Sequence, residues 1–80
     1  MPFTLRMVVL GANGKPVIVL ETRRLKARTV EEAKVEADSG PWNIGEIQPT
    51  GFEILDGQGA PVARRRYMGK GVYVPWTKSL

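Results

Sequence analysis

Residues 10–17 read LGANGKPV and residues 55–62 read LDGQGAPV, so Leu, the second Gly, Pro and Val recur at a constant spacing of 45 residues. Each copy lies between two runs rich in apolar and β-branched residues, which is the pattern of a tight turn between two strands. Because glycine tolerates positive φ, we expect Gly14 and Gly59 in the left-handed position of three-residue turns. The repeat therefore predicts two β-hairpins, over residues 3–22 and 52–67.

The segment between the two hairpins carries the signature of a short helix. Thr29 precedes Val-Glu-Glu, so its hydroxyl can accept from the N–H of Glu32 while the Glu32 carboxylate reaches back to the N–H of Thr29. Gly40 and Pro41 can end the helix, which we expect over residues 30–39. Its apolar stripe is small, which lets the helix lie close to a sheet: Val30, Ala33 and Ala37.

These elements predict one α+β domain spanning residues 1–80. We expect a mostly antiparallel sheet of four to five strands, built from two or three hairpins, with one short helix packed on one face, in the order ββαββ. The sequence Met-Gly-Lys-Gly after the second hairpin resembles a third turn, which would lead to an extra C-terminal strand over residues 72–76. The pairing between the hairpins does not follow from the sequence.

The expected turns set the register of the first hairpin. With three-residue turns, Val9 opposes Val17 and Met7 opposes Val19, and the face that carries them receives the helix. The opposite face then carries four clustered apolar residues: Val8, Leu10, Ile18 and Leu20. Either the C-terminal residues 72–76 or a second copy of the protein would cover such a patch. We therefore expect a homodimer that uses this face.

The same reasoning gives the register of the second hairpin. Ile54 is expected opposite Val62, and Glu53 opposite Ala63. One face of this hairpin is then apolar, and the other face carries both polar and apolar residues.

The chain is basic, with a formal net charge of +4, and its strongest charge run is Arg64-Arg65-Arg66. Neighbours on a strand alternate faces, so Arg64 and Arg66 point one way and Arg65 the other. Cations mixed with aromatic rings suit phosphate contacts and base stacking on DNA or RNA. The candidate nucleic-acid site comprises Arg64, Arg65, Arg66, Tyr67, Lys70, Tyr73 and Trp76. Alternatively, this charge only protects a strand edge against aggregation.

Several function classes are excluded by composition. The chain has no Cys and no His, which removes disulfides, thiolate and imidazole catalysis, and the commonest metal ligands. Each glycine-rich turn joins two strands and lacks the Gly-Lys-Ser/Thr of a phosphate loop. We therefore expect no catalytic site, no metal, no cofactor and no small-molecule substrate.

No apolar run approaches the ~20 residues that span a membrane. The N-terminal residues do not resemble a signal peptide, so a cytoplasmic location and no membrane partner are expected. The sequence predicts a small non-enzymatic interaction or assembly module that associates with itself. The alternative is a nucleic-acid-binding protein that uses the basic, aromatic C-terminal region.

Overall fold

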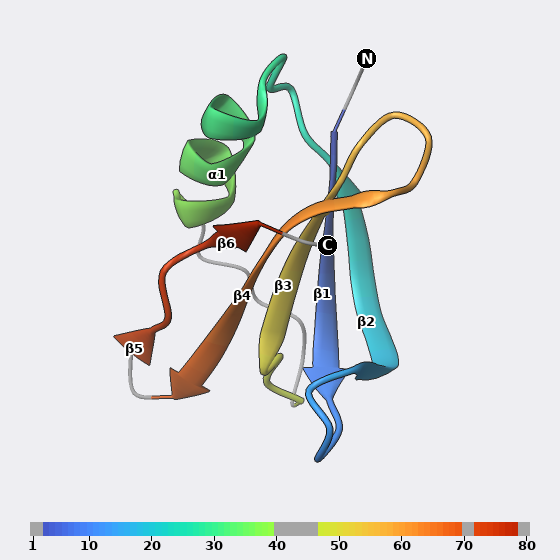
Figure 1. Cartoon of the computed structure of the whole chain (residues 1–80), viewed down its shortest axis with the longest axis vertical. Helices are drawn as coiled ribbons and strands as arrows, with labels where there is room; N and C mark the ends of the chain where they lie inside the picture. The colour runs from blue at the N-terminus through green and yellow to red at the C-terminus, as the bar shows by residue number, and fades with distance from the viewer. Residues whose placement is uncertain (1–2, 40–46, 70–71, 79–80) are drawn as a thin grey trace.

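The computed structural model describes residues 3–39, 47–69 and 72–78. Its strands and single helix follow the expected order, with two further short strands at the C-terminal end (Figure 1): β1 Thr4–Leu10, β2 Pro16–Arg24, α1 Val30–Asp38, β3 Gly51–Leu55, β4 Pro61–Gly69, β5 Val72–Tyr73 and β6 Thr77–Lys78. The expected small α+β fold is confirmed. No helix in these residues is both long and apolar enough to cross a membrane.

The two turns of the sequence repeat have the same hydrogen bonds. In the first, Gly11 N donates to Lys15 O and Gly14 N donates to Gly11 O. The second turn repeats both bonds 45 residues later, from Asp56 N and Gly59 N. Gly14 has φ 79° and Gly59 has φ 84°, which confirms the left-handed position predicted for both glycines.

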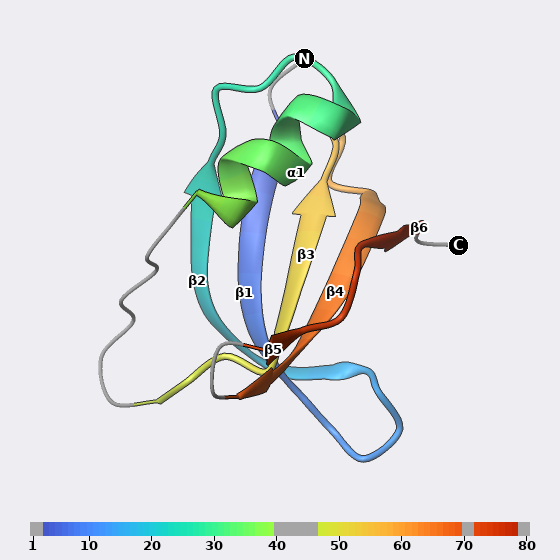
Figure 2. The ribbon, with the colours of Figure 1, turned by 90° about the vertical axis from the view of Figure 1, so that its left-hand side faces the viewer.

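The hairpins join through their first strands. The sheet order is β2-β1-β3-β4-β5, and β1 pairs antiparallel with β3 so that Leu5 opposes Ile54 and Met7 opposes Phe52. Figure 2 shows these strands side by side, with β2 at one edge. This order places the inner strands β1 and β3 at the centre of the sheet, where their residues are mostly buried.

The registers predicted within the hairpins are wrong. Met7 opposes Glu21 and Val9 opposes Ile18, because extra residues at Val17 and Leu20 shift β2 against β1. Each extra residue is a β-bulge, and one unpaired residue moves the side chains beyond it to the other face.

The second hairpin contains a bulge of the same kind. Leu55 opposes Pro61 as the turn requires, but the register then shifts so that Ile54 opposes Ala63 and not Val62. Glu53 consequently opposes Arg64, whereas the sequence predicts Ala63. This shift places a carboxylate directly opposite a guanidinium.

Helix α1 is capped at its N-terminus as predicted. The Thr29 hydroxyl accepts from Glu32 N at 3.1 Å. The carboxylate of Glu32 accepts from Arg28 N at 3.4 Å, one residue before the predicted donor. The helix ends at Asp38 with Ser39 as its C-cap, one residue earlier than expected. The predicted ending at Gly40 lies outside the described residues.

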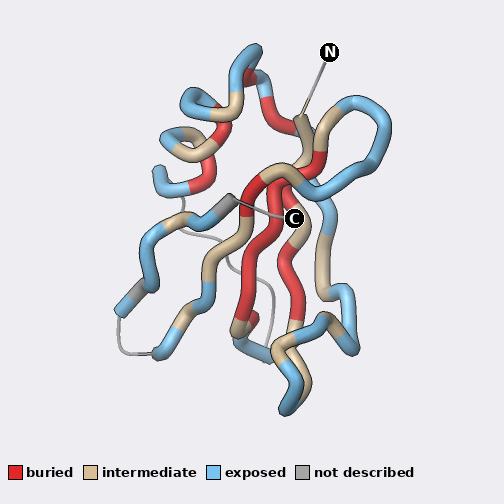
Figure 3. The backbone as a smooth tube through the Cα atoms, in the orientation of Figure 1, coloured by how far each residue is buried: buried red, intermediate tan, exposed pale blue. Residues whose placement is uncertain are grey.

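The core lies between α1 and one face of the sheet. Ala33 and Ala37 are buried against Leu5, Met7 and the neighbouring strands, as the small apolar stripe predicts. In Figure 2 the helix crosses the upper ends of β1 and β3, and in Figure 3 the buried residues follow these two strands and the inner side of the helix. Hydrogen bonds also hold the helix against residues 25–29, which connect β2 to α1. The Glu36 carboxylate accepts from Lys26 N and Ala27 N.

The C-terminal segment runs along the outer edge of β4. Strand β5 pairs with β4 at Tyr67 and Gly69, and β6 pairs with it at Ala63 and Arg64. The extra strand predicted over residues 72–76 is therefore two short strands separated by residues 74–76. Pro75 lies in the interruption, and its missing N–H cannot take part in a ladder. Both short strands thus pair with β4, and not with the first hairpin, which the sequence gives as one of two alternatives for this segment to cover.

Candidate functional site

Strand β2 forms an open edge of the sheet. Within the residues that the structure describes, β2 pairs with β1 alone. Val17, Ile18 and Val19 are consecutive on it and are 64%, 51% and 50% exposed. Figure 3 shows the contrast between this half-exposed strand and the buried strands β1 and β3. An edge strand presents unpaired backbone N–H and C=O groups, which can pair with another chain.

The first five residues of this edge strand carry no charge, whereas its second half carries Glu21, Arg23 and Arg24. Residues 16–20 read PVIVL, and the first charged residues on either side are Lys15 and Glu21. Natural edge strands are usually blocked by charged side chains, proline or bulges. Here Pro16 and the bulges at Val17 and Leu20 are present, but no charge lies between Lys15 and Glu21.

The four residues predicted as a self-association face do not form one exposed face. Val8 is fully buried and pairs with Val19, and Leu10 is half-buried over Gly51. Leu20 is half-buried in a bulge, and only Ile18 is exposed. The prediction is wrong because it assumes a regular ladder. The bulge at Val17 pairs Ile18 with Val9 and Val19 with Val8, so Val8 and Ile18 lie on different faces.

Arg65 belongs to the face that carries the helix. Its Nη1 donates to the Asp38 carboxylate at the end of α1, and its Nε donates to Val74 O at 3.0 Å. The guanidinium also lies over the ring of Trp76, 4.7 Å from the centroid. The indole Nε1 donates to Asp38 at 3.1 Å. Arg65 and Trp76 therefore fasten the C-terminal segment to the helix.

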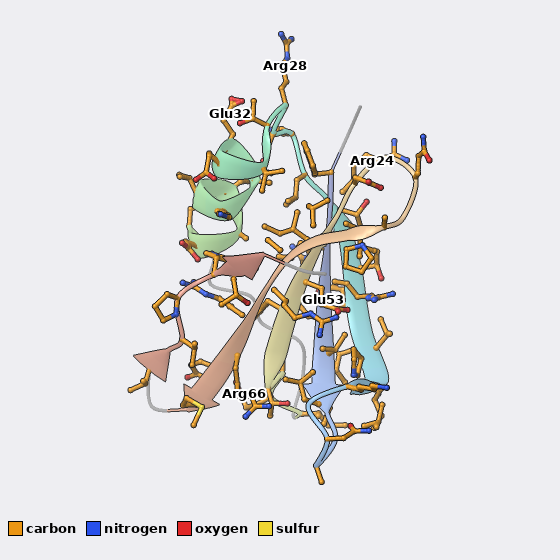
Figure 4. The ribbon with its side chains drawn as sticks, in the orientation of Figure 1. Arg24, Arg28, Glu32, Glu53 and Arg66 are labelled. Carbon is orange, nitrogen blue, oxygen red and sulfur yellow. The ribbon has the colours of Figure 1, made fainter. Side chains whose placement is uncertain are left out.

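Arg64 lies on the opposite face, in an ion-pair row across three strands. The carboxylate of Glu53, whose side chain is 3% exposed, accepts from Arg6 Nε at 2.9 Å and from Arg64 Nη2 at 3.1 Å. The three residues come from β1, β3 and β4, and Figure 4 shows Glu53 in the middle of the sheet. This arrangement confirms the predicted alternation of Arg64 and Arg65.

Arg66 is exposed, and within the described part of the chain its guanidinium has no acidic partner. It extends toward the first hairpin turn, where a Cβ on Gly14 would lie 3.3 Å from its Nη2. Arg24 and Arg28 are also exposed but lie at the other end of the molecule from Arg66 (Figure 4). The exposed arginines therefore do not form one patch.

The aromatic candidates for nucleic-acid binding lie on and beside β4, where Tyr67 pairs with Tyr73 of β5. Tyr67 is half-buried and packs against the core, as does Trp76. Tyr73 belongs to β5, and Lys70 lies outside the described residues. Arg64 and Arg65 are paired with Glu53 and Asp38, so within the described part of the chain Arg66 is the arginine of this run without an acidic partner.

Sequence reasoning missed Glu53 and Asp38, the two acids that organise the arginine run. The register predicted from the sequence pairs Glu53 with Ala63, whereas the structure pairs it with Arg64. The sequence does contain a signal for this pairing: Glu53 is a lone acid between Phe52 and Ile54 in an apolar strand, and a buried carboxylate requires a cation close to it. Nothing local links Asp38 to Arg65, which lies 27 residues away.

Among residues 3–39, 47–69 and 72–78, no group of three acidic side chains is placed to hold a metal ion. No family model, curated protein or solved structure matches this chain.

Proposed function

We propose that this chain is a small non-enzymatic interaction module that associates with itself through the edge strand β2. The observation that carries the proposal is the open edge of β2 with three consecutive exposed residues, Val17, Ile18 and Val19. Pairing two such edges would extend the sheet through main-chain hydrogen bonds and bury the exposed apolar groups. We also propose a cytoplasmic location, because a chain without cysteine fits a reducing compartment.

The sequence of β2 favours one register for this dimer. In an antiparallel pair centred on Ile18, Val17 opposes Val19 of the second copy and Lys15 opposes its Glu21. The apolar residues then meet each other and opposite charges meet at both ends. Centring the pair one residue later, on Val19, would place Lys15 opposite Arg23 of the second copy, and like charges repel.

Size-exclusion chromatography with light scattering tests the proposal. The natural chain is expected to approach twice the chain mass as its concentration rises, and Ile18→Lys is expected to stay monomeric because it places two cations at the centre of the pair. Val35→Lys is the matched control, since Val35 is 70% exposed but lies on α1. A monomeric natural chain would mean that the bulges and Pro16 protect the edge, and would overturn the proposal.

The same experiment examines the alternative of nucleic-acid binding. A mixed-sequence DNA duplex is added at low and at moderate salt, because phosphate contacts weaken steeply with salt. We expect no shift onto DNA, since Arg64 and Arg65 already pair with acids of the chain itself. A salt-sensitive complex that is lost in Arg66→Ala would support the alternative instead.

A further inference from the structure

A hollow of about 150 Å³ lies beside Arg64 and Arg66, where the first hairpin turn and the C-terminal segment approach β3 and β4. Its lining combines charged and apolar groups and includes Leu10, Gly14, Glu53, Arg64, Arg66 and Val74. A second hollow of about 300 Å³ shares Leu10 and Arg66 with the first. Arg66, which Figure 4 shows near the first hairpin turn, therefore borders both hollows.

The charges around the first hollow do not balance. Arg64, Arg65 and Arg66 line it, and the acid among the lining residues is Glu53. Arg65 is paired with Asp38, which does not line the hollow. The Glu53 carboxylate is shared with Arg6, whose Nε and Nη2 both donate to its Oε1. At least one positive charge is therefore left for a ligand. Since Glu53 would repel a second negative charge, the site favours a monoanion over a dianion.

Arg64, one of the residues that line the hollow, also carries a hydrogen-bond donor for which the described residues supply no acceptor. The Nε of Arg64 is buried and has no hydrogen-bond partner among residues 3–39, 47–69 and 72–78, although the Nη2 of the same guanidinium donates to Glu53. A buried donor without an acceptor costs free energy that a ligand oxygen would recover. Arg64 and Arg66 are two residues apart on one strand, so their side chains leave the same face and can reach one anion.

The geometry points to a binding site for a small monocarboxylate. The carboxylate accepts from Arg64 Nε and from the guanidinium of Arg66, because the guanidinium fork suits a planar carboxylate. The apolar body of the ligand lies against Leu10 and Val74. A cavity of this volume holds about one benzene ring. The carboxylate comes either from a free organic acid or from the C-terminal residue of a peptide, whose remaining chain would enter the second hollow.

Titration followed by ¹H–¹⁵N NMR tests the site, with benzoate as the first probe. We expect benzoate to shift the Nε–H signals of Arg64 and Arg66 in a saturable way. Benzamide, which has the ring without the charge, should not shift them. Inorganic phosphate should bind more weakly than benzoate because Glu53 repels its second charge. Phosphate binding more tightly than benzoate would overturn the assignment to a monocarboxylate.

Short peptides distinguish the two sources of the carboxylate. A peptide that ends in phenylalanine is compared as the free acid and as the C-terminal amide. Tighter binding of the free acid than of benzoate identifies a peptide terminus, and equal or weaker binding identifies a small organic acid. If neither benzoate nor the free-acid peptide shifts the two signals, the site does not exist.

A pair of variants separates the site from general attraction to a basic protein. Arg66→Gln is expected to weaken the binding of the better probe about tenfold, the effect of losing one charge-assisted hydrogen bond. Its fold should persist because Arg66 takes part in no ion pair within the described residues. Arg24→Gln removes an equally exposed cation at the other end of the molecule and should leave binding unchanged. Equal effects of the two variants would overturn the proposal.

Discussion

At the scale of single residues, Glu53 has the most unusual environment in the sheet. Only 3% of its side chain is exposed, whereas its partners Arg6 and Arg64 are 29% and 44% exposed. A carboxylate is rarely buried unless cations surround it. The guanidiniums of both flanking arginines remain in contact with water. The buried carboxylate is therefore neutralised by two cations that are themselves partly hydrated.

Replacing Glu53 by glutamine should therefore destabilise the fold. Glu53→Gln keeps the shape of the side chain but removes the charge that two guanidiniums share. We expect a loss of about 2 kcal/mol, below the full cost of breaking a buried pair because both arginines are partly hydrated. Urea unfolding measures this loss. Glu21→Gln is the control, since its exposed pair with Arg23 should contribute under about 1 kcal/mol. Equal losses would contradict this account of Glu53.

Gly59 is a second residue whose local geometry makes a sharp prediction. Its φ of 84° is in the left-handed region, and nothing lies within 4 Å of the place where a Cβ would be. Gly59→Ala should thus cost about 1 kcal/mol through backbone strain alone.

Two neighbouring variants isolate that strain in thermal unfolding. Gly59→Asn should cost less than Gly59→Ala, because asparagine tolerates this conformation better. Gln58→Ala should cost little, since the backbone N–H of Gln58, and not its side chain, bonds to Asp56. If the alanine and asparagine variants at position 59 were equally stable, the left-handed assignment would be wrong.

At the scale of elements, the features that the sequence predicted well depend on residues close together in the chain. Each turn is fixed by a few residues that include a positive-φ glycine, and the helix start is fixed by the Thr29 hydroxyl and the N–H of Glu32. The interruption of the last strand was missed, although Pro75 marks it.

The helix cap offers a test at this scale. Thr29→Ala removes the acceptor for the N–H of Glu32 and should lower the free energy of unfolding by about 1 kcal/mol. Thr29→Ser keeps the hydroxyl and should stay close to the natural chain. The comparison is made by urea unfolding monitored by circular dichroism. A serine variant as unstable as the alanine variant would show that the threonine methyl group, and not the cap, matters here.

At the scale of the whole molecule, the surfaces were harder to predict because they depend on the register. A single unpaired residue such as Val17 changes which side chains share a face, so Val8 and Ile18 lie on different faces and the predicted apolar face disappears. The candidate site could be predicted only in part. Exposed Ile18 was identified correctly, but the open edge of β2 depends on the pairing of β1 with β3, which no local pattern specifies.

The proposed role of the molecule is self-association through β2. Because the chain has no cysteine, a single introduced cysteine can test this pairing directly by disulfide cross-linking. In the proposed register Ile18 opposes Ile18 of the second copy. Residues that are directly opposite in an antiparallel pair have Cα atoms about 4.5–5.5 Å apart, which a disulfide can span. Ile18→Cys would therefore place two thiols within bonding range at the centre of the dimer.

The decisive measurement is the fraction of disulfide-linked dimer formed by Ile18→Cys in a thiol–disulfide buffer, read on a non-reducing gel. Val35→Cys provides the comparison, because it exposes a thiol on α1, away from the edge strand. We predict that Ile18→Cys becomes a covalent dimer under conditions in which Val35→Cys remains a monomer. Equal cross-linking of the two variants, or none at position 18, would contradict pairing through β2.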